Sequence, residues 1–209
     1  MFYEQDIVDL RGKVKLYMSE HRYIHTIGVE NAAIRIGNVI MPDRVNELRV
    51  AALLHDIAKE LPNAELTLLI DKELQGLTEV DMDTFAALHS FAAPALIKRD
   101  FEHYATDSVL EAAFTHTLGS DTMDLFSEVI FVSDFVEENR TYIGCRKTAE
   151  YLFGSLSPDK ACEENVYVLH TAALMCIDHT ARSLSQRGLT MNPRSIDAFD
   201  MLSKSIIAN

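Results

Sequence analysis

A histidine and an aspartate lie side by side within an apolar stretch of the sequence. Residues 50–59 read VAALLHDIAK, so that His55 and Asp56 are flanked by apolar residues on both sides. If this stretch is a helix, it is apolar on nearly every face, which predicts burial. A buried carboxylate is costly unless a cation neutralises it. Because imidazole and carboxylate together suit iron, manganese or zinc, the pair favours a metal site.

Further histidines and one further acid lie on apolar faces of predicted helices. His25, His89 and His116 fall on such faces, and Asp134 is embedded in the run FVSDFV. One histidine of this kind is most often an ordinary core residue, so each is weak evidence alone. The candidate metal ligands are His25, His55, Asp56, His89, His116 and Asp134. Their order along the chain, H…HD…H…H…D, favours a shared metal site over unrelated core residues.

The elements that must position these residues are predicted to be helices. Glycine (8) and proline (5) are scarce, and apolar residues recur at helical spacing. The run 129–136 reads locally as a strand, but its helical context favours a buried helix. The predicted helices cover residues 4–18, 20–40, 44–61, 83–98, 106–118, 122–139 and 147–188. The last of these is broken near 157–159. A short helix and a linker are predicted in 63–80, and a final helix runs through 206. One all-α domain over residues 1–209 is the economical prediction.

Composition limits the classes of partner and compartment. The chain has 209 residues and a formal net charge of −13, which repels nucleic-acid backbone and anionic membrane as bulk partners. Its cysteines number 3 and have no C-x-x-C spacing, so neither a disulfide framework nor a thiolate metal site is predicted. Unpaired thiols fit a reducing compartment. The N-terminus resembles no signal peptide, and no apolar run reaches the length of a membrane span. We therefore expect a cytoplasmic protein.

Several sequence motifs resemble those of the HD-domain metal-dependent phosphohydrolase superfamily. Within it, the chain is similar to the bacterial YqeK family of symmetrical diadenosine tetraphosphate hydrolases. The motifs that carry this resemblance are HRYIHTIGV at 21–29, LLHDIAKELP at 53–62, LHS at 88–90, HTLG at 116–119, FVSDFVEENR at 131–140 and NPRSIDAFD at 192–200. The chain departs from the family at Phe135, where a tyrosine is frequent, and at Leu118, where a small polar residue is common. No metal ligand of the family pattern is missing.

The resemblance implies a single HD-domain helical bundle with a two-metal site. The core would span about residues 20–140, with the C-terminal helices 147–209 packing on it and closing the nucleotide site. His25, His55, Asp56 and Asp134 would hold one metal, Asp56 would bridge to the second, and His89 and His116 would complete it. Iron is the expected metal, with manganese or another divalent metal as the alternative. The implied reaction is attack of a metal-bound hydroxide on diadenosine tetraphosphate or a related dinucleoside polyphosphate, releasing two ADP.

The same resemblance suggests residues that contact the substrate. Lys59 and Arg140 each lie within two helical turns of a candidate ligand and are expected to donate to phosphate oxygens. His21, one turn before His25, is expected to contact phosphate or to act as a general acid, so Asp56, His21 and Lys59 are the candidate catalytic residues. The other candidate substrate contacts are Thr117, Arg194 and Ser195. An ADP-like or GDP-like nucleotide is the expected partner, and a homodimer is left open.

Several alternatives to this function remain open at the level of sequence. The HD pattern by itself specifies phosphohydrolysis, so an HD-type nucleotidase, a guanosine tetraphosphate hydrolase or a cyclic-dinucleotide phosphodiesterase fits it too. The absence of a GYP signature counts against the phosphodiesterase. A non-catalytic nucleotide-binding module would be marked by a lost ligand, and none is lost. Outside the pattern, His170 and His179 have no buried acid near them in sequence and are predicted to be structural or surface residues.

Overall fold

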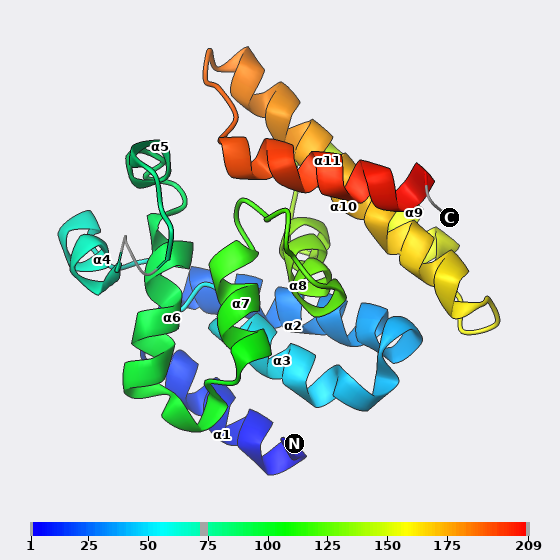
Figure 1. Ribbon diagram of the computed structural model, residues 1–209. Coiled ribbons are helices and arrows are strands. Elements are labelled where there is room, and N and C mark those ends of the chain that lie inside the picture. Colours follow the sequence, from blue (N-terminus) through cyan, green and yellow to red (C-terminus); the bar gives the residue numbers. More distant parts are fainter. Residues whose placement is uncertain (1, 72–74, 208–209) are drawn as a thin grey trace.

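The computed structural model describes residues 2–71 and 75–207. Within these residues the chain forms helices and no β-strand, which confirms the predicted all-α class (Figure 1). The α-helices are α1 (Glu4–Val14), α2 (Glu20–Ile40), α3 (Val45–Leu54), α4 (Asn63–Leu69), α5 (Glu79–Asp83), α6 (Leu88–Asp100), α7 (Asp107–Thr115), α8 (Leu125–Val136), α9 (Ile143–Ser155), α10 (Cys162–Gln186) and α11 (Pro193–Ile207). Short 3-10 helices, η1 (Pro42–Arg44) and η2 (Glu102–Tyr104), precede α3 and α7. Residues 72–74 of the predicted 63–80 segment lie outside the described part.

The middle of the fold consists of helices α2, α3, α7 and α8, which pack against one another. Helix α3 is deeply enclosed, because every side chain from Val50 to Leu54 is fully buried. Around this centre, α1 packs on α3 and α6 packs on α7 (Figure 1). The central helices therefore bring α2, α8 and the ends of α3 and α7 close together in the interior.

Polar side chains mark where several of these helices begin. The Ser19 hydroxyl accepts a hydrogen bond from the backbone N–H of Arg22 at the start of α2, and the Asp124 carboxylate accepts one from Ser127 at the start of α8. Such caps satisfy N–H groups that have no partner within the helix. The β-branched run in α8 is helical, which confirms the interpretation of 129–136 as a helix.

Several predicted helices end earlier than the apolar pattern suggested, and two of these ends lie directly before candidate ligands. The helix expected over 44–61 stops at Leu54, and residues 55–60 continue as tight turns with hydrogen bonds such as Lys59 N–H to Asp56 O, at 2.9 Å. The helix expected over 106–118 stops at Thr115. Periodicity missed both ends because apolar residues continue the pattern, with Ile57 and Ala58 buried beyond α3 and Leu118 half-buried beyond α7.

The C-terminal helices lie along one side of this centre. The chain breaks between α9 and α10 near 157–159, as predicted, and α10 packs on both α8 and α2, while α11 packs on α10 (Figure 1). The Asn192 Oδ1 caps α11 by accepting from Arg194 N–H at 2.9 Å. The Ser195 hydroxyl donates to Leu118 O at 2.8 Å, which ties α11 to the loop after α7. That all these helices form one domain over 1–209 stays a prediction.

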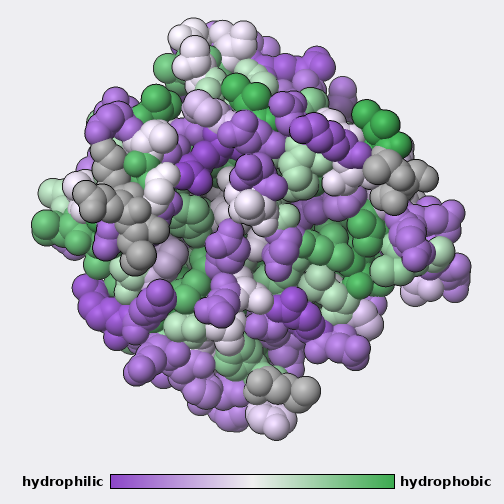
Figure 2. Space-filling view, in the orientation of Figure 1, coloured by the Kyte–Doolittle hydropathy of each residue, from purple (hydrophilic) through white to green (hydrophobic). Residues whose placement is uncertain are grey.

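One face of the described residues is mainly polar. Figure 2 shows hydrophilic residues over much of one face, with hydrophobic residues gathered in separate patches between them. None of the described helices is both long and apolar enough to cross a lipid bilayer.

Candidate metal centre

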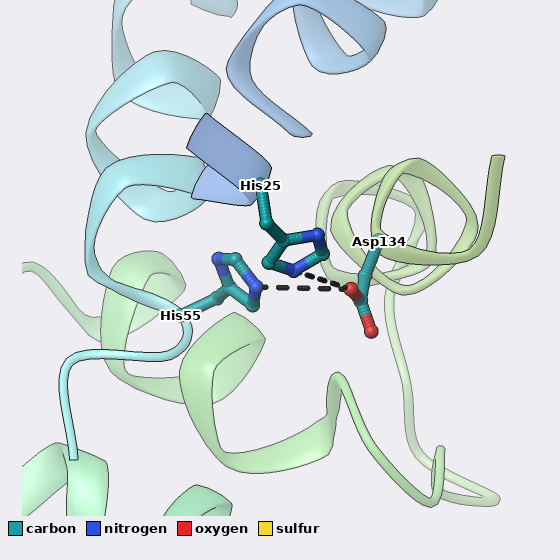
Figure 3. Close-up of side chains that lie close together, drawn as sticks. All are labelled: His25, His55 and Asp134. Atoms are coloured by element: carbon teal, nitrogen blue, oxygen red, sulfur yellow. Dashed lines mark ion pairs between the residues drawn. The ribbon is translucent and has the colours of Figure 1, made fainter. Parts of the chain in front are cut away.

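The structure brings all the predicted metal ligands together in the middle of the fold. His25 comes from α2, His89 from the first turn of α6 and Asp134 from α8, while His55 with Asp56 follows α3 and His116 follows α7. In Figure 3 the rings of His25 and His55 point toward the Asp134 carboxylate, and their Nε2 atoms lie 3.0 and 3.9 Å from its Oδ1. Donor atoms bound at about 2.1 Å from one ion stand roughly 3–3.5 Å apart. The distance from His25 to Asp134 matches donors around a shared cation, and the distance from His55 to Asp134 is somewhat longer.

The two oxygens of Asp56 face two different groups of histidines. Its Oδ2 lies 3.6 Å from Nε2 of both His25 and His55. Its Oδ1 lies 3.1 Å from Nε2 of His89 and 3.4 Å from Nε2 of His116. The Asp56 carboxylate is thus flanked by imidazoles on each side, which is the arrangement a bridging ligand between two cations requires.

The imidazole rings are held so that their Nε2 atoms face the cluster. Nδ1 of His55 donates to Ala52 O at 2.6 Å, and Nδ1 of His116 donates to Ala113 O at 2.8 Å. Both acceptors are carbonyls of the last turn of a helix, which lack partners within the helix. Because each histidine directly follows the end of its helix, its ring can reach back to the carbonyl three residues earlier. This fixes the tautomer that leaves Nε2 free to bind a metal.

Two buried nitrogen atoms of the cluster lack a hydrogen-bond partner. Nε2 of His25 and Nε2 of His55 are enclosed and make no hydrogen bond in the described structure. Such a buried polar atom is costly unless a bound group satisfies it. Two sets of side chains place their donor atoms within reach of a single ion: His25, His55 and Asp134, and His55, Asp56 and His116. The residues therefore fit a divalent metal site made of imidazole nitrogens and carboxylate oxygens.

Burial and neighbouring charges shift the pKa values of the carboxylates in the cluster in opposite directions. Burial alone would raise the pKa of Asp56, but His55 and the other neighbouring imidazoles hold it well below its usual value. Burial would likewise raise the pKa of Asp134, which Arg140 and His25 hold well below the ordinary range. Burial lowers the pKa of His55 to about 3. The centre thus keeps its carboxylates ionised and His55 neutral, the forms that bind metal.

Positive side chains line the edge of the centre. The Lys59 Nζ lies 3.9 Å from Oδ1 of Asp56 and 3.1 Å from Nε2 of His89. The Arg140 guanidinium donates to Oδ1 of Asp134 at 2.6 Å and to its backbone oxygen at 3.0 Å. The Thr117 hydroxyl lies 3.0 Å from Nε2 of His116. The structure therefore places three of the predicted substrate contacts beside the cluster.

The remaining predicted substrate contacts have no described contact with the cluster. His21 is exposed on α2, and no contact joins it to the cluster among the interactions described. The Arg194 guanidinium lies 3.2 Å from Asp81 on α5 and donates to Gly76 O at 3.0 Å, so it holds α5 against the start of α11. Ser195 faces the backbone of Leu118. Roles for His21, Arg194 and Ser195 at a substrate stay predictions.

Two residues beside the cluster were missed by the sequence reasoning. Arg22 donates to Oδ2 of Asp56 at 2.6 Å, and the Glu137 carboxylate accepts from Nδ1 of His25 at 3.1 Å. Spacing contained a signal for Glu137, which follows Asp134 by three residues and lies directly after the last residue of α8. Arg22 carried the same kind of signal, since it precedes His25 by three residues on α2, although its partner Asp56 lies on another element.

Comparison with known proteins supports the same class of protein. A family model described as HD domain matches residues 22–139, the span that contains every candidate metal ligand. The chain belongs to the HD-domain family.

Its relatives include proteins named symmetrical bis(5′-nucleosyl)-tetraphosphatase. The one from Bacillus subtilis is 34% identical over 140 residues, which cover 66% of this chain and 74% of the relative. The one from Halalkalibacterium halodurans is 34% identical over 143 residues with the same coverage. A crystal structure from Clostridium acetobutylicum, described as a predicted HD superfamily hydrolase involved in NAD metabolism, aligns with a TM-score of 0.76 at 25% identity over 98% of both chains. The family resemblance drawn from the motifs is confirmed.

Proposed function

We propose that this chain is a metal-dependent phosphohydrolase that cleaves diadenosine tetraphosphate, or a related dinucleoside polyphosphate, symmetrically into two nucleoside diphosphates. The observation that carries the proposal is the position of Asp56, whose two carboxylate oxygens face separate groups of histidines. The names of the relatives from Bacillus subtilis and Halalkalibacterium halodurans supply the substrate class.

In this proposal the candidate ligands divide between two cations. The first is held by His25, His55, Asp56 and Asp134, and the second by His89 and His116 with Asp56 shared between them. Two divalent cations supply Lewis-acid chemistry, since they lower the pKa of water and neutralise charge that develops on phosphoryl oxygens. Because imidazoles outnumber carboxylates in this set, iron is the expected metal and manganese is the alternative.

The chain's own cations orient the polyphosphate. Lys59 and Arg22 lie against Asp56, and Arg140 lies against Asp134, so a phosphate placed at the cluster meets ammonium and guanidinium donors at its edge. Guanidinium groups match the geometry of phosphate oxygens and hold them through paired hydrogen bonds. The Thr117 hydroxyl adds a neutral donor. These contacts place the central phosphates beside the cluster, where cleavage yields equal halves.

The proposal also covers the binding partner, the closure of the site and the cellular compartment. An overall net charge of −13 disfavours nucleic acid and anionic membrane as partners, whereas the local cations at the cluster favour a small anionic nucleotide. The C-terminal helices, through the turn that holds Arg194 and Ser195, would close the nucleotide site. A cytoplasmic location is the matching compartment, and the oligomeric state is left open.

Product analysis tests the proposal. Protein purified without oxygen and loaded with iron or manganese is incubated with diadenosine tetraphosphate, and the products are resolved by anion-exchange chromatography. ADP as the sole nucleotide product is expected, and Asp56→Ala should abolish its formation. Asp43→Ala is the matched control, because Asp43 is an exposed aspartate away from the cluster. AMP together with ATP, or no turnover by the metal-loaded wild type, would contradict symmetrical hydrolysis.

A further inference from the structure

The turn that carries His116 rests against α11, which lies C-terminal to every candidate ligand (Figure 1). His116 and Thr117 follow the end of α7, and Leu118 and Gly119 complete the turn. The Ser195 hydroxyl donates to Leu118 O at 2.8 Å, across 77 positions of sequence. Because a turn has no helical ladder to hold its carbonyls, a hydrogen bond from another element fixes where it lies. Helix α11 therefore contacts the backbone two residues after a candidate ligand.

Gly119 brings the same turn against a second residue of α11. Its φ is +73°, in the left-handed region that favours glycine, and its N–H donates to Thr115 O at 2.7 Å. A Cβ added at Gly119 would lie 2.9 Å from Cβ of Ala198, which is buried. Two carbon atoms pack at about 3.5–4.0 Å, so only glycine permits this approach. Leu118 and Gly119 together fit the turn onto α11.

A buried polar cluster fixes the start of α11. Nδ2 of Asn192 donates to Oδ1 of Asp81 at 3.1 Å and to Oγ1 of Thr84 at 3.0 Å. The Arg194 guanidinium lies 3.2 Å from the same oxygen of Asp81. Asp81 and Asn192 are 2% and 6% exposed, so water hardly competes for these contacts. Ser195, the next residue along the chain, therefore has a fixed position from which to hold the turn.

The turn lies beside one side of the metal centre. The Thr117 hydroxyl lies 3.1 Å from Nε2 of His89 and 3.0 Å from Nε2 of His116. Among the described residues, no hydrogen bond or ion pair joins this turn or α11 to His25 or Asp134, which contact each other on the opposite side. A shift of the turn would therefore displace His116 and Thr117 first.

We propose that Ser195 is a positioning residue for the second cation of the centre, because its hydrogen bond to Leu118 O holds the turn from which His116 points. The inference rests on the proposed function, which divides the candidate ligands between two cations. Ser195 acts through the backbone of the turn and touches no candidate ligand itself. The orientation of a metal ligand depends on the contacts behind it, and loss of such contacts weakens metal binding. Helix α11 thereby couples the C-terminal part of the chain to one of the two cations.

Manganese binding tests this role without any substrate. Ser195→Ala removes the hydroxyl and should weaken the binding of one manganese ion roughly tenfold while the other ion binds as in the wild type. Titration followed by electron paramagnetic resonance separates the two ions, because a coupled manganese pair and a single manganese ion give different spectra. Gly119→Ala should cause the same selective loss. Ser203→Ala is the matched control, since Ser203 lies two turns further along α11 and makes no described hydrogen bond to the turn.

A double variant assigns the weakened ion to its side of the centre. His89→Gln removes a ligand of the second cation, so adding Ser195→Ala to it should leave the remaining ion unaffected. Further weakening in that double variant, equal weakening of both ions in Ser195→Ala, or wild-type binding of both ions would overturn the positioning role. Weaker ADP binding by Ser195→Ala with both ions at wild-type affinity would overturn it too, and would make Ser195 a substrate contact. Wild-type protein that shows the selective dependence on Ser195 but forms AMP and ATP would refute the proposed function and leave the positioning role intact.

Discussion

The Glu137 carboxylate and the His25 imidazole form a buried pair, with Oε1 of Glu137 3.1 Å from Nδ1 of His25. The other oxygen of Glu137 accepts from the backbone N–H of Asn139 at 2.7 Å and from its side-chain amide at 2.9 Å. The turn after α8 therefore holds Glu137, and Glu137 orients the ring whose Nε2 faces Asp134. A carboxylate behind a metal-binding histidine sets the tautomer and raises its basicity as a ligand.

Replacing Glu137 should weaken metal binding while leaving the ligands themselves in place. Glu137→Gln removes the charge behind His25 and is expected to lower metal affinity roughly 10- to 100-fold, as loss of such supporting groups does. Competition with a chromogenic chelator measures the change. Glu138→Gln is the matched control, because Glu138 is the next residue and is exposed. Equal metal affinity in the two variants would show that Glu137 has no supporting role.

Gly28 on α2 makes room for this same carboxylate. A Cβ at Gly28 would lie 2.3 Å from Oε2 of Glu137 and 2.9 Å from Nδ2 of Asn139, so Gly28→Ala must displace the pair. We expect Gly28→Ala to lower metal affinity as Glu137→Gln does and to lower the melting temperature. Gly12→Ala is the control in α1, where an added Cβ meets nothing within 4 Å. A helical Gly→Ala change without a clash stabilises by about 0.5–1 kcal/mol, so opposite shifts in melting temperature are predicted, and matching shifts would count against the clash.

Metal removal should destabilise the fold. The cluster gathers the buried carboxylate of Asp56 and the half-buried carboxylate of Asp134 with His55 Nε2, which makes no hydrogen bond in the described structure. A ligand present at 100 times its dissociation constant stabilises by about 2.7 kcal/mol, and each kcal/mol shifts the melting temperature of a chain this size by about 2–4 °C. Scanning calorimetry with manganese and with excess chelator should show this rise in the wild type and its absence in Asp134→Asn. An identical metal-dependent rise in that variant would exclude Asp134 as a ligand.

A second buried ion pair predicts how stability depends on pH. Glu128 on α8 lies 2.9 Å from Nδ1 of His170 on α10. The Glu128 carboxylate raises the pKa of His170 above 6.5, and burial raises the pKa of Glu128 above 4.5. Both raised values mean that the folded state binds more protons than the unfolded state, so stability falls as pH rises. The contribution of His170 is complete below pH 6.5 and is lost as the pH passes its folded pKa.

Urea unfolding at pH 6 and at pH 9 measures this dependence. The wild type should lose more stability between the two values than His170→Gln, which cannot gain a proton at this position. His103→Gln is the control, because His103 is an exposed histidine on η2. A pH dependence in His170→Gln as steep as that of the wild type would rule out the pair as its source.

Much of the centre could be predicted from sequence because each ligand occupies an apolar face. That pattern located His25, His89 and Asp134, and the motifs around them identified the family. It did not reveal that His55 and His116 follow the ends of their helices, because Ile57 and Ala58 beyond α3 and Leu118 beyond α7 continue the apolar pattern. Hydrophobic periodicity reports which side of an element is buried and says little about where the element stops.

Contacts between separate elements were the other source of missed residues. Arg22 reaches Asp56 from α2, and no spacing along the chain links them. His170 is a structural residue, but its partner was not foreseen, because Glu128 lies 42 positions earlier in sequence and beside it in space. Pairings of this kind depend on how helices pack, which local sequence patterns do not encode.

The most direct test of the two-cation centre is the metal content per chain. Protein loaded with iron or manganese without oxygen, then desalted, is measured by inductively coupled plasma mass spectrometry for the wild type and for Asp56→Asn. A carboxylate shared between two ions predicts about two ions per wild-type chain and a large loss in the variant. Folded wild-type protein that retains no metal, or a variant that retains as much as the wild type, would contradict the centre described here.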